Sequence, residues 1–147
     1  MKLSTRTRYG TRALIELALR QGQGPVFLKD VAQKQQISLP YLEHLVAPLI
    51  AGGIIRSTKG PKGGISLAKE PKDIKLSEIT RLLEGSTAPV ECVDDPKVCQ
   101  RAGACAARDV WSRLKEAMDS VLETTTLEDL AEEQKRKGRH EPSMYYI

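Results

Sequence analysis

The sequence predicts a mostly α-helical fold with one small β-hairpin, organised as a winged helix-turn-helix followed by a long dimerisation helix. Three observations lead to this class. Apolar residues recur at helical spacing through most of the first 51 residues. A Gly/Lys-rich segment between two short apolar runs then predicts a hairpin. Beyond residue 106, a heptad pattern predicts one long helix.

The first predicted helix runs from Thr5 to about Arg20, with Ser4 or Thr5 as its cap. Arg6, Arg8 and Arg12 stand in its first turns, where cations oppose the helix dipole. Local helix stability therefore does not explain these arginines, which suit either contact with phosphate groups or a solvated basic face. The apolar positions at helical spacing are Tyr9, Ala13, Leu14, Leu17 and Ala18.

A second, short helix is predicted from Leu28 to Gln35, and a third from the good N-cap Ser38 to about Ala51. Pro40 is tolerated in the third helix because amides of the first turn have no intrahelical partner. Two short helices joined by a tight turn match a helix-turn-helix. The stripe expected to be buried in the third helix is Leu42, Leu45, Val46, Leu49 and Ile50. The opposite face shows Pro40, Tyr41, Glu43, His44 and Ala47.

Gly52 and Gly53 end the third helix, and short strands are predicted at 54–56 and 65–67. The connecting sequence STKGPKGG carries lysines and exposed amides at its tip. Directly after a helix-turn-helix, such a hairpin is typical of a wing. A nucleotide phosphate loop is the alternative for a Gly-rich segment, but neither of the common signatures of that loop is present.

Two further helices complete the predicted fold, a short one over Leu76 to Glu84 and a long one from Ala107. About 19 residues at ~1.5 Å each make the second helix roughly 28 Å long. Its apolar seam exceeds what one small neighbour covers, so we expect pairing with the same helix of a second subunit. The residues expected in that dimer contact are Trp111, Leu114, Met118 and Val121. Leu127 to Lys137 suits another helix, and the last ten residues suit a flexible tail.

The net charge of +4 over 147 residues conceals an asymmetry. Residues 1–75 hold thirteen Lys/Arg against five Asp/Glu, whereas residues 76–147 hold ten against fourteen. A basic half joined to an acidic half is typical of a polyanion-binding module with a separate second module. No apolar run approaches the roughly 20 residues that span a bilayer, and the N-terminus lacks the apolar region of a signal peptide. We therefore expect a cytoplasmic protein without membrane contact.

All three cysteines, Cys92, Cys99 and Cys105, fall in one stretch that is predicted to be a loop. In a reducing cytosol, clustered cysteines are more often metal ligands or redox-active thiols than disulfides. Zinc is an alternative, although the close cysteine pairs typical of zinc sites are absent from the sequence. An enzyme such as a thiol oxidoreductase is disfavoured, because there is no C-x-x-C and no evident pair of nucleophile and base.

These residues together resemble the winged-helix transcriptional regulators typified by the iron–sulfur cluster regulator IscR, with nitric-oxide-sensing NsrR and cysteine-metabolism CymR as relatives. The matching segments are LSTRTRYG, ISLPYLEHLVAPLIAGGII, KGPKGGISLAK and the cysteine loop followed by CAARDVWSRL. The resemblance implies a homodimeric transcription factor that binds an imperfect palindrome in double-stranded DNA. We accordingly expect a DNA-binding domain at 1–84, a cluster-binding loop at 85–106, a dimerisation region at 107–137 and a flexible tail at 138–147.

By the same resemblance, Pro40, Tyr41 and Glu43 lie at positions that approach bases. Lys59 takes a wing-tip position where the family often has an Arg in the minor groove, and Lys suits that groove less well. Glu43 can accept a hydrogen bond from cytosine N4 but repels phosphate, so it suits specificity rather than affinity. The candidates for phosphate contact are Arg6, Arg8 and Lys62, with Gly60 as a further DNA-binding residue at the wing tip.

The resemblance also implies that Cys92, Cys99 and Cys105 hold an iron–sulfur cluster, [2Fe–2S] or [4Fe–4S], through soft thiolate ligands. IscR-like members place a fourth ligand, His, where this chain has Arg108. The nitric-oxide sensors use an acidic residue of the partner chain where this chain has Arg8. The expected function is therefore a redox, iron or nitric-oxide sensor. The alternative is a cluster-free regulator that uses its thiols, beside Arg101 or Arg108, or another effector. The remaining candidates for a fourth ligand are Glu91, Asp94, Asp95, Asp109, His140 or a non-protein ligand.

Overall fold

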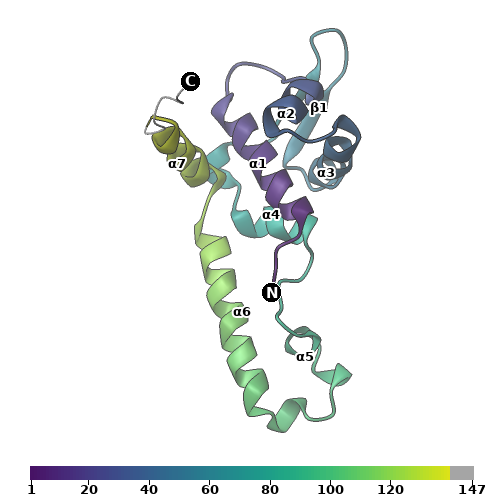
Figure 1. The fold of residues 1–147 in the computed structure, drawn as a ribbon, viewed down its shortest axis with the longest axis vertical. Helices are drawn as coiled ribbons and strands as arrows, with labels where there is room; N and C mark the ends of the chain where they lie inside the picture. The colour runs from purple at the N-terminus through teal and green to yellow at the C-terminus, as the bar shows by residue number, and fades with distance from the viewer. Residues whose placement is uncertain (140–147) are drawn as a thin grey trace, which may run out of the picture.

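The computed structural model describes residues 1–139, which form a compact helical body with a small hairpin and one long helix that leads away from it (Figure 1). This is the predicted mostly α-helical class. Within the described range, no helix is both long enough and apolar enough to cross a membrane. The elements are α1 (Thr5–Leu19), α2 (Leu28–Gln35), α3 (Leu39–Ala51), β1 (Ile55–Thr58), β2 (Gly64–Leu67), α4 (Leu76–Leu83), α5 (Glu91–Asp94), α6 (Ala106–Thr124) and α7 (Leu127–Arg139).

The first three helices begin and end where the sequence predicts. The Ser4 side chain accepts a hydrogen bond from the amide of Thr7 and caps α1, and Ser38 accepts from the amide of Tyr41 and caps α3. Helix α2 is closed by Gln36 in the left-handed conformation, with φ 56°. The amide of Ile37 then bonds back to the carbonyl of Ala32 at 3.0 Å, which makes the turn between α2 and α3 tight.

The hairpin is antiparallel, with Ile55 opposite Leu67 and Thr58 opposite Gly64. Its first strand begins one residue later and ends two residues later than the sequence suggested, because pairing continues to Gly64. Val26 forms an isolated antiparallel bridge with β2, since Val26 and Ile65 exchange two backbone hydrogen bonds of 2.8 Å. The hairpin is thereby tied to the segment that precedes α2.

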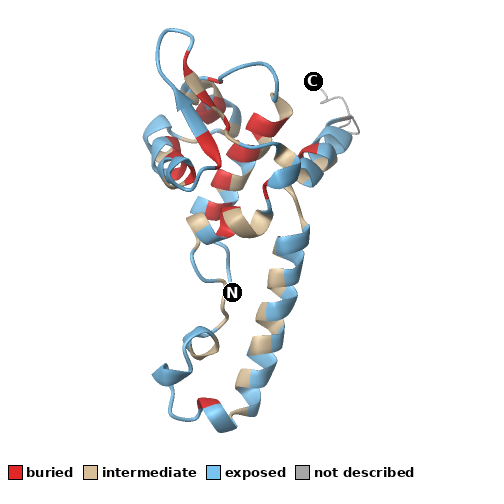
Figure 2. Cartoon of the chain, turned by 180° about the vertical axis from the view of Figure 1, so that it is seen from behind, coloured by how far each residue is buried: buried red, intermediate tan, exposed pale blue. Residues whose placement is uncertain are grey.

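One hydrophobic core joins α1, α2, α3, the hairpin and α4 (Figure 2). Leu127 and Ala131 of α7 also belong to it, because α7 packs back along α1. The predicted stripe of α3 is buried except for Ile50, whose side chain is 39% exposed, so its predicted burial was wrong. Ile50 stands near the end of α3. The fully buried large side chains include Leu14, Leu42, Leu45, Leu49, Ile54, Ile65, Ile74, Ile79 and Leu127.

Helix α6 is fixed to the core mainly at its C-terminal end. There the amide of Leu76 donates to the carbonyl of Thr125 at 2.9 Å, and the amide of Leu127 donates to Ile74 at 2.8 Å. Lys75 and Ser77 both bond the Glu123 carboxylate, at 2.6 Å and 2.7 Å. None of the 19 residues of α6, all within the described range, is buried. The helix therefore extends from the core as a largely uncovered arm (Figure 2).

Two sequence predictions need correction at the ends of this arm. The cysteine stretch is not a plain loop, because it contains α5 and the short 3-10 turns Pro96–Val98 and Ala102–Ala104, with Ala102 buried. The expected flexible tail was to begin at residue 138, but α7 continues through residues 138 and 139. Residues 140–147, including the candidate ligand His140, lie outside the described residues.

The backbone of Val26 lies so close to β2 that a side chain larger than that of Gly64 has no room. A Cβ there would lie 2.3 Å from the Val26 carbonyl oxygen, and the φ of 153° disfavours a side chain. We expect Gly64→Ala to lower the free energy of unfolding by about 1–3 kcal/mol, measured by urea denaturation at fixed protein concentration. Gly103→Ala is the control, because open space surrounds that position. Equal midpoints for Gly64→Ala and the wild type would contradict this account of the wing.

Candidate nucleic-acid interface and cysteine loop

Helix α3 presents its polar face at the surface. Because Leu42 and Leu45 are buried at 0% and 1% exposure, the residues between and before them point outward. Pro40 and Glu43 are exposed, and Tyr41 is half-buried. Tyr41 was expected on the open face, but part of its surface is covered by α1, where its hydroxyl lies 3.2 Å from the Thr5 Oγ1.

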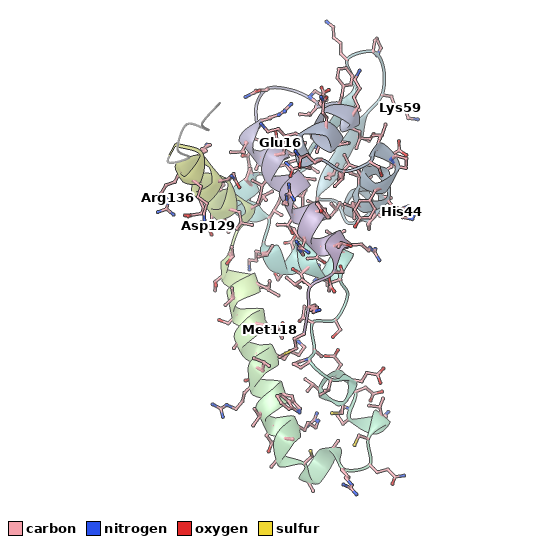
Figure 3. All side chains as sticks on the ribbon, in the orientation of Figure 1. Glu16, His44, Lys59, Met118, Asp129 and Arg136 are labelled. Atoms are coloured by element: carbon pink, nitrogen blue, oxygen red, sulfur yellow. The ribbon has the colours of Figure 1, made fainter. Side chains whose placement is uncertain are left out.

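The wing tip lies on the same side of the molecule as the exposed face of α3, as the positions of Lys59 and His44 in Figure 3 show. Lys59, Gly60 and Lys62 are all exposed. The turn is closed by a hydrogen bond of 2.9 Å from the Gly63 amide to the Gly60 carbonyl. Gly60 has φ 105°, a conformation that favours glycine. The tip is thus a short, defined turn that carries two cations.

The N-terminus of α1 is held by the carboxylate of Glu84, which directly follows α4. Glu84 accepts hydrogen bonds from the Ser4 amide at 3.0 Å, from the Ser4 hydroxyl at 2.7 Å and from the Thr7 hydroxyl. The Thr7 bond is the main cause that lowers the pKa of Glu84 from its ordinary value near 4.5, and Ser4 and the nearby Arg6 add to it. Sequence reasoning missed this contact, because 80 residues separate Glu84 from Ser4.

Two consequences follow for the arginines of α1. A carboxylate at the N-terminus of α1 favours the helix dipole and offsets part of the cost of placing Arg6 there. Arg6 and Arg8 are both exposed and so remain available to a ligand. Close packing supports the arrangement, because a Cβ at Gly10 would come within 2.4 Å of Leu83 Cδ1. Arg6 and Arg8, the predicted phosphate contacts of α1, therefore lie at a helix end that is fixed in position.

The cysteine stretch lies at the far end of α6 from the core (Figure 1). Cys92 and Cys105 are half-buried, Cys99 is exposed, and all three are free thiols. Arg108, in the first turns of α6, donates from Nε to the carbonyl of Cys92 at 2.8 Å. Arg108, which stands where the resembling regulators place a His ligand, therefore holds Cys92 against α6 and closes the cysteine stretch.

The three thiols fit an iron–sulfur cluster in kind, because thiolates are the ligands such clusters use. The positions of the three thiols in this structure, however, do not suit a shared cluster. Within residues 1–139, no group of three or more His, Cys, Asp or Glu side chains lies close enough to hold a metal ion. Arg108 supplies a donor rather than a ligand. Cys92, Cys99 and Cys105 would have to move together to share one group, and the mostly exposed stretch leaves them room to do so.

A groove of about 640 Å³ runs between α6 and the opposite chain segments. Its floor includes Met118, which Figure 3 shows on the side of α6 that faces the chain after α4. Trp111, which lies outside the groove, is 38% exposed, and Val121, which lines it, is 63% exposed. A partner that packs on this face of α6 would cover these apolar side chains. The groove lining further comprises Met1, Leu3, Ala88, Pro89, Ala117, Val121 and Leu122 among mostly apolar residues.

Comparison with known proteins connects this architecture to a function. A family model described as Rrf2, iron-dependent transcriptional regulator, matches residues 3–133. The transcriptional regulator CymR of Bacillus subtilis is 43% identical over 147 residues, the whole of both chains. Protein rrf2 of Nitratidesulfovibrio vulgaris is 44% identical over 130 residues, 88% of this chain and 87% of its own.

Solved structures agree with the sequence relatives. The structure of CymR, the global cysteine regulator of B. subtilis, matches with a TM-score of 0.77 over 90% of this chain and 97% of that chain. The structure of T. potens IscR, at 36% identity, matches with a TM-score of 0.79 over 99% of this chain and 97% of that chain. The long arm and the winged helix are thus found together in both relatives.

The Glu84 network makes a pH-dependent prediction. Its carboxylate has a lowered pKa in the folded state, so its contribution to stability is present above its unfolded pKa and is lost as pH falls through the folded pKa. We expect Glu84→Gln to lower the free energy of unfolding by about 1 kcal/mol at pH 7, since the group is partly exposed. The difference from the wild type should shrink toward pH 3, as measured by urea denaturation.

Glu78→Gln is the matched control on the same helix. Glu78 pairs with Lys69 at 2.9 Å on the surface, and such exposed pairs contribute little. A Glu84→Gln deficit that persists unchanged at pH 3 would show that the carboxylate charge is not its cause.

Proposed function

This chain belongs to the Rrf2 family of transcriptional regulators, and from that premise we propose that it acts as a homodimer that reads an imperfect palindrome in DNA. One observation carries the proposal. The polar face of α3, the wing tip and the exposed arginines of α1 belong to one winged helix whose recognition helix is fixed by the Ser38 cap. A duplex that meets α3 in its major groove also meets cations on both flanks.

The proposed contacts divide into two kinds. Arg6, Arg8 and Lys62 contact phosphates, which gives affinity that falls with salt. Glu43 accepts from a cytosine amino group and, because it repels phosphate, adds specificity at some cost in affinity. The other proposed DNA contacts are Pro40 and Tyr41 at the bases, Lys59 in the minor groove and the Gly60 amide at the wing tip.

The proposed dimer contact is the apolar face of α6, built on Trp111, Leu114, Met118 and Val121. The free face of α6 and the groove beside it are what support this contact. Heptad spacing suits packing against a second long helix. Two recognition helices related by a twofold axis would then meet two half-sites of a palindrome.

We further propose that Cys92, Cys99 and Cys105 form the sensor of this regulator by holding an iron–sulfur cluster. Three thiols in one stretch, and a family described as iron-dependent, support this proposal. When bound, such a group would supply sensitivity to oxidants, iron or nitric oxide. The chain's own residues would position it. Cys92 lies in α5, Cys99 and Cys105 each directly follow a 3-10 turn, and Arg108 ties Cys92 to the arm.

Cluster-free thiol sensing is the second candidate, and one observation favours it. The three thiols stay apart, each is free, and Cys99 is exposed to solvent. An exposed thiol can react without any rearrangement of the stretch. The similarity to a global cysteine regulator fits an effector of this kind as well.

Measurements of DNA affinity distinguish the proposed base contacts from the proposed phosphate contacts. Glu43→Ala should lower discrimination between the selected operator and its variants by about 1–3 kcal/mol at one base pair. Arg8→Gln should weaken binding to every duplex and reduce the salt slope by about one. Fluorescence anisotropy at several salt concentrations measures both. Lys135→Gln, on α7, is the control for charge. Equal binding of operator and random duplexes by the wild type would sink the proposed function.

Anaerobic purification separates the two sensors. A cluster predicts a coloured protein with iron and sulfide, lost in Cys92→Ala, Cys99→Ala and Cys105→Ala alike. Native mass spectrometry of the same sample should give the mass of two chains plus two clusters. A colourless, iron-free dimer contradicts the cluster proposal. It leaves thiol sensing, which predicts that mild oxidation changes DNA affinity in the wild type but not in a variant lacking all three cysteines.

A further inference from the structure

Tyr41, the half-buried residue on the outer face of α3, is held by two contacts from α1. Its ring meets that of Tyr9 edge to face, with centroids 6.1 Å apart and planes at 84°. Its hydroxyl lies 3.2 Å from the hydroxyl oxygen of Thr5. A tyrosine side chain has two rotatable torsions before its hydroxyl, and these two contacts restrict both. Tyr41 is therefore oriented before any ligand arrives.

Arg12 is a further contact of Tyr9. Its guanidinium carbon lies 5.2 Å from the centroid of the Tyr9 ring, within the range of a cation–π contact. Its Nε also donates to the side-chain oxygen of Gln35, at the end of α2, at 2.9 Å. The chain Gln35, Arg12, Tyr9 and Tyr41 thus connects α2, α1 and α3 across the surface of the winged helix.

Arg12 therefore differs from its neighbours Arg6 and Arg8. In the sequence, all three suit either phosphate contact or a solvated basic face. The planar guanidinium of Arg12 already has an aromatic face and an amide oxygen as partners. Its geometry suits a brace, because a guanidinium can stack and donate at the same time.

We propose that Tyr9 is a positioning residue for DNA reading, which acts through Tyr41 and is itself held by Arg12. This inference rests on the proposed function, in which Tyr41 approaches bases. An ordered Tyr41 loses less conformational entropy on binding, and it presents one shape to the bases. Tyr9 and Arg12 should therefore govern the preference for the operator over other sequences, while the phosphate contacts govern the affinity common to all duplexes.

The test uses the full-length dimer and two DNA probes. One is the duplex that the wild type selects from a random library, and the other is a scrambled duplex of equal length. An edge-to-face pair contributes about 0.5–1.5 kcal/mol, so Tyr9→Leu should lower the operator-to-scrambled ratio about 2- to 10-fold. Binding to the scrambled duplex and the salt slope should stay unchanged. Tyr9→Phe keeps the ring and should keep the ratio.

A double-mutant cycle shows whether Tyr9 works through Tyr41. The variant with both Tyr9→Leu and Tyr41→Leu should be no worse than Tyr41→Leu alone. Additive losses would overturn the positioning role. So would a Tyr9→Phe protein as impaired as Tyr9→Leu, or a Tyr9→Leu protein that loses both duplexes equally.

Arg12→Gln provides a test that does not depend on the Tyr9→Leu variant, because the Arg12 side chain is exposed and its replacement leaves the core intact. It should lower the operator-to-scrambled ratio with the salt slope of the wild type, whereas Arg8→Gln should make that slope shallower. A shallower slope for Arg12→Gln would make Arg12 a phosphate contact and overturn the brace, even if Tyr9→Leu fails to fold. A wild type that selects no sequence would instead refute the proposed function itself.

Discussion

The carboxylate of Glu84 is the contact on which the arrangement of this molecule most depends. It joins the first turn of α1 to the end of α4, 80 residues further along the chain, at the point where the chain leaves for the cysteine stretch. Its partners are donors that α1 would otherwise leave unpaired, so the contact caps the helix as well as attaching it. In the proposed regulator, the helix end that carries Arg6 and Arg8 is therefore set by the residue from which the chain departs toward its sensor.

Helix α6 is the rigid element that connects the core to the cysteine stretch. Its C-terminal end is pinned by two backbone hydrogen bonds and the Glu123 carboxylate, and its N-terminal end carries the cysteine stretch. At ~1.5 Å per residue, the two ends are roughly 28 Å apart, so a small rotation at either end displaces the other by several ångströms. The groove between α6 and the chain after Glu84 leaves space for such a movement in the single chain. In the proposed dimer, the partner fills that space and fixes the angle.

Periodicity and capping residues were enough to predict the longer helices, whereas the four-residue α5 lies in a stretch that was predicted to be a loop. Ser4, one of the two residues expected to cap α1, and Ser38, expected to cap α3, both accept the capping bonds, and α6 begins within one residue of its predicted start. What could not be predicted is polar and distant. The contacts of Glu84 with Ser4 and of Tyr9 with Tyr41 join residues far apart in the chain, and no local pattern marks them. Buried Glu16 is the intermediate case, because its partner Arg20 lies one helical turn away. The roles of individual residues toward DNA and the cysteines stay predictions.

Arg108, in place of the His of the resembling regulators, changes how the cysteine stretch is attached to α6. A His ligand, as in the resembling regulators, would tie α6 to the group that is sensed, and loss of the group would release the helix. Arg108 instead holds the backbone carbonyl of Cys92, so its bond is made to the backbone and not to the sulfur. A hydrogen bond from a charged donor contributes about 1.5–3 kcal/mol. In the proposed sensor, a chemical change at Cys92 would move this residue away from α6 only if the rearrangement gains more free energy than that bond.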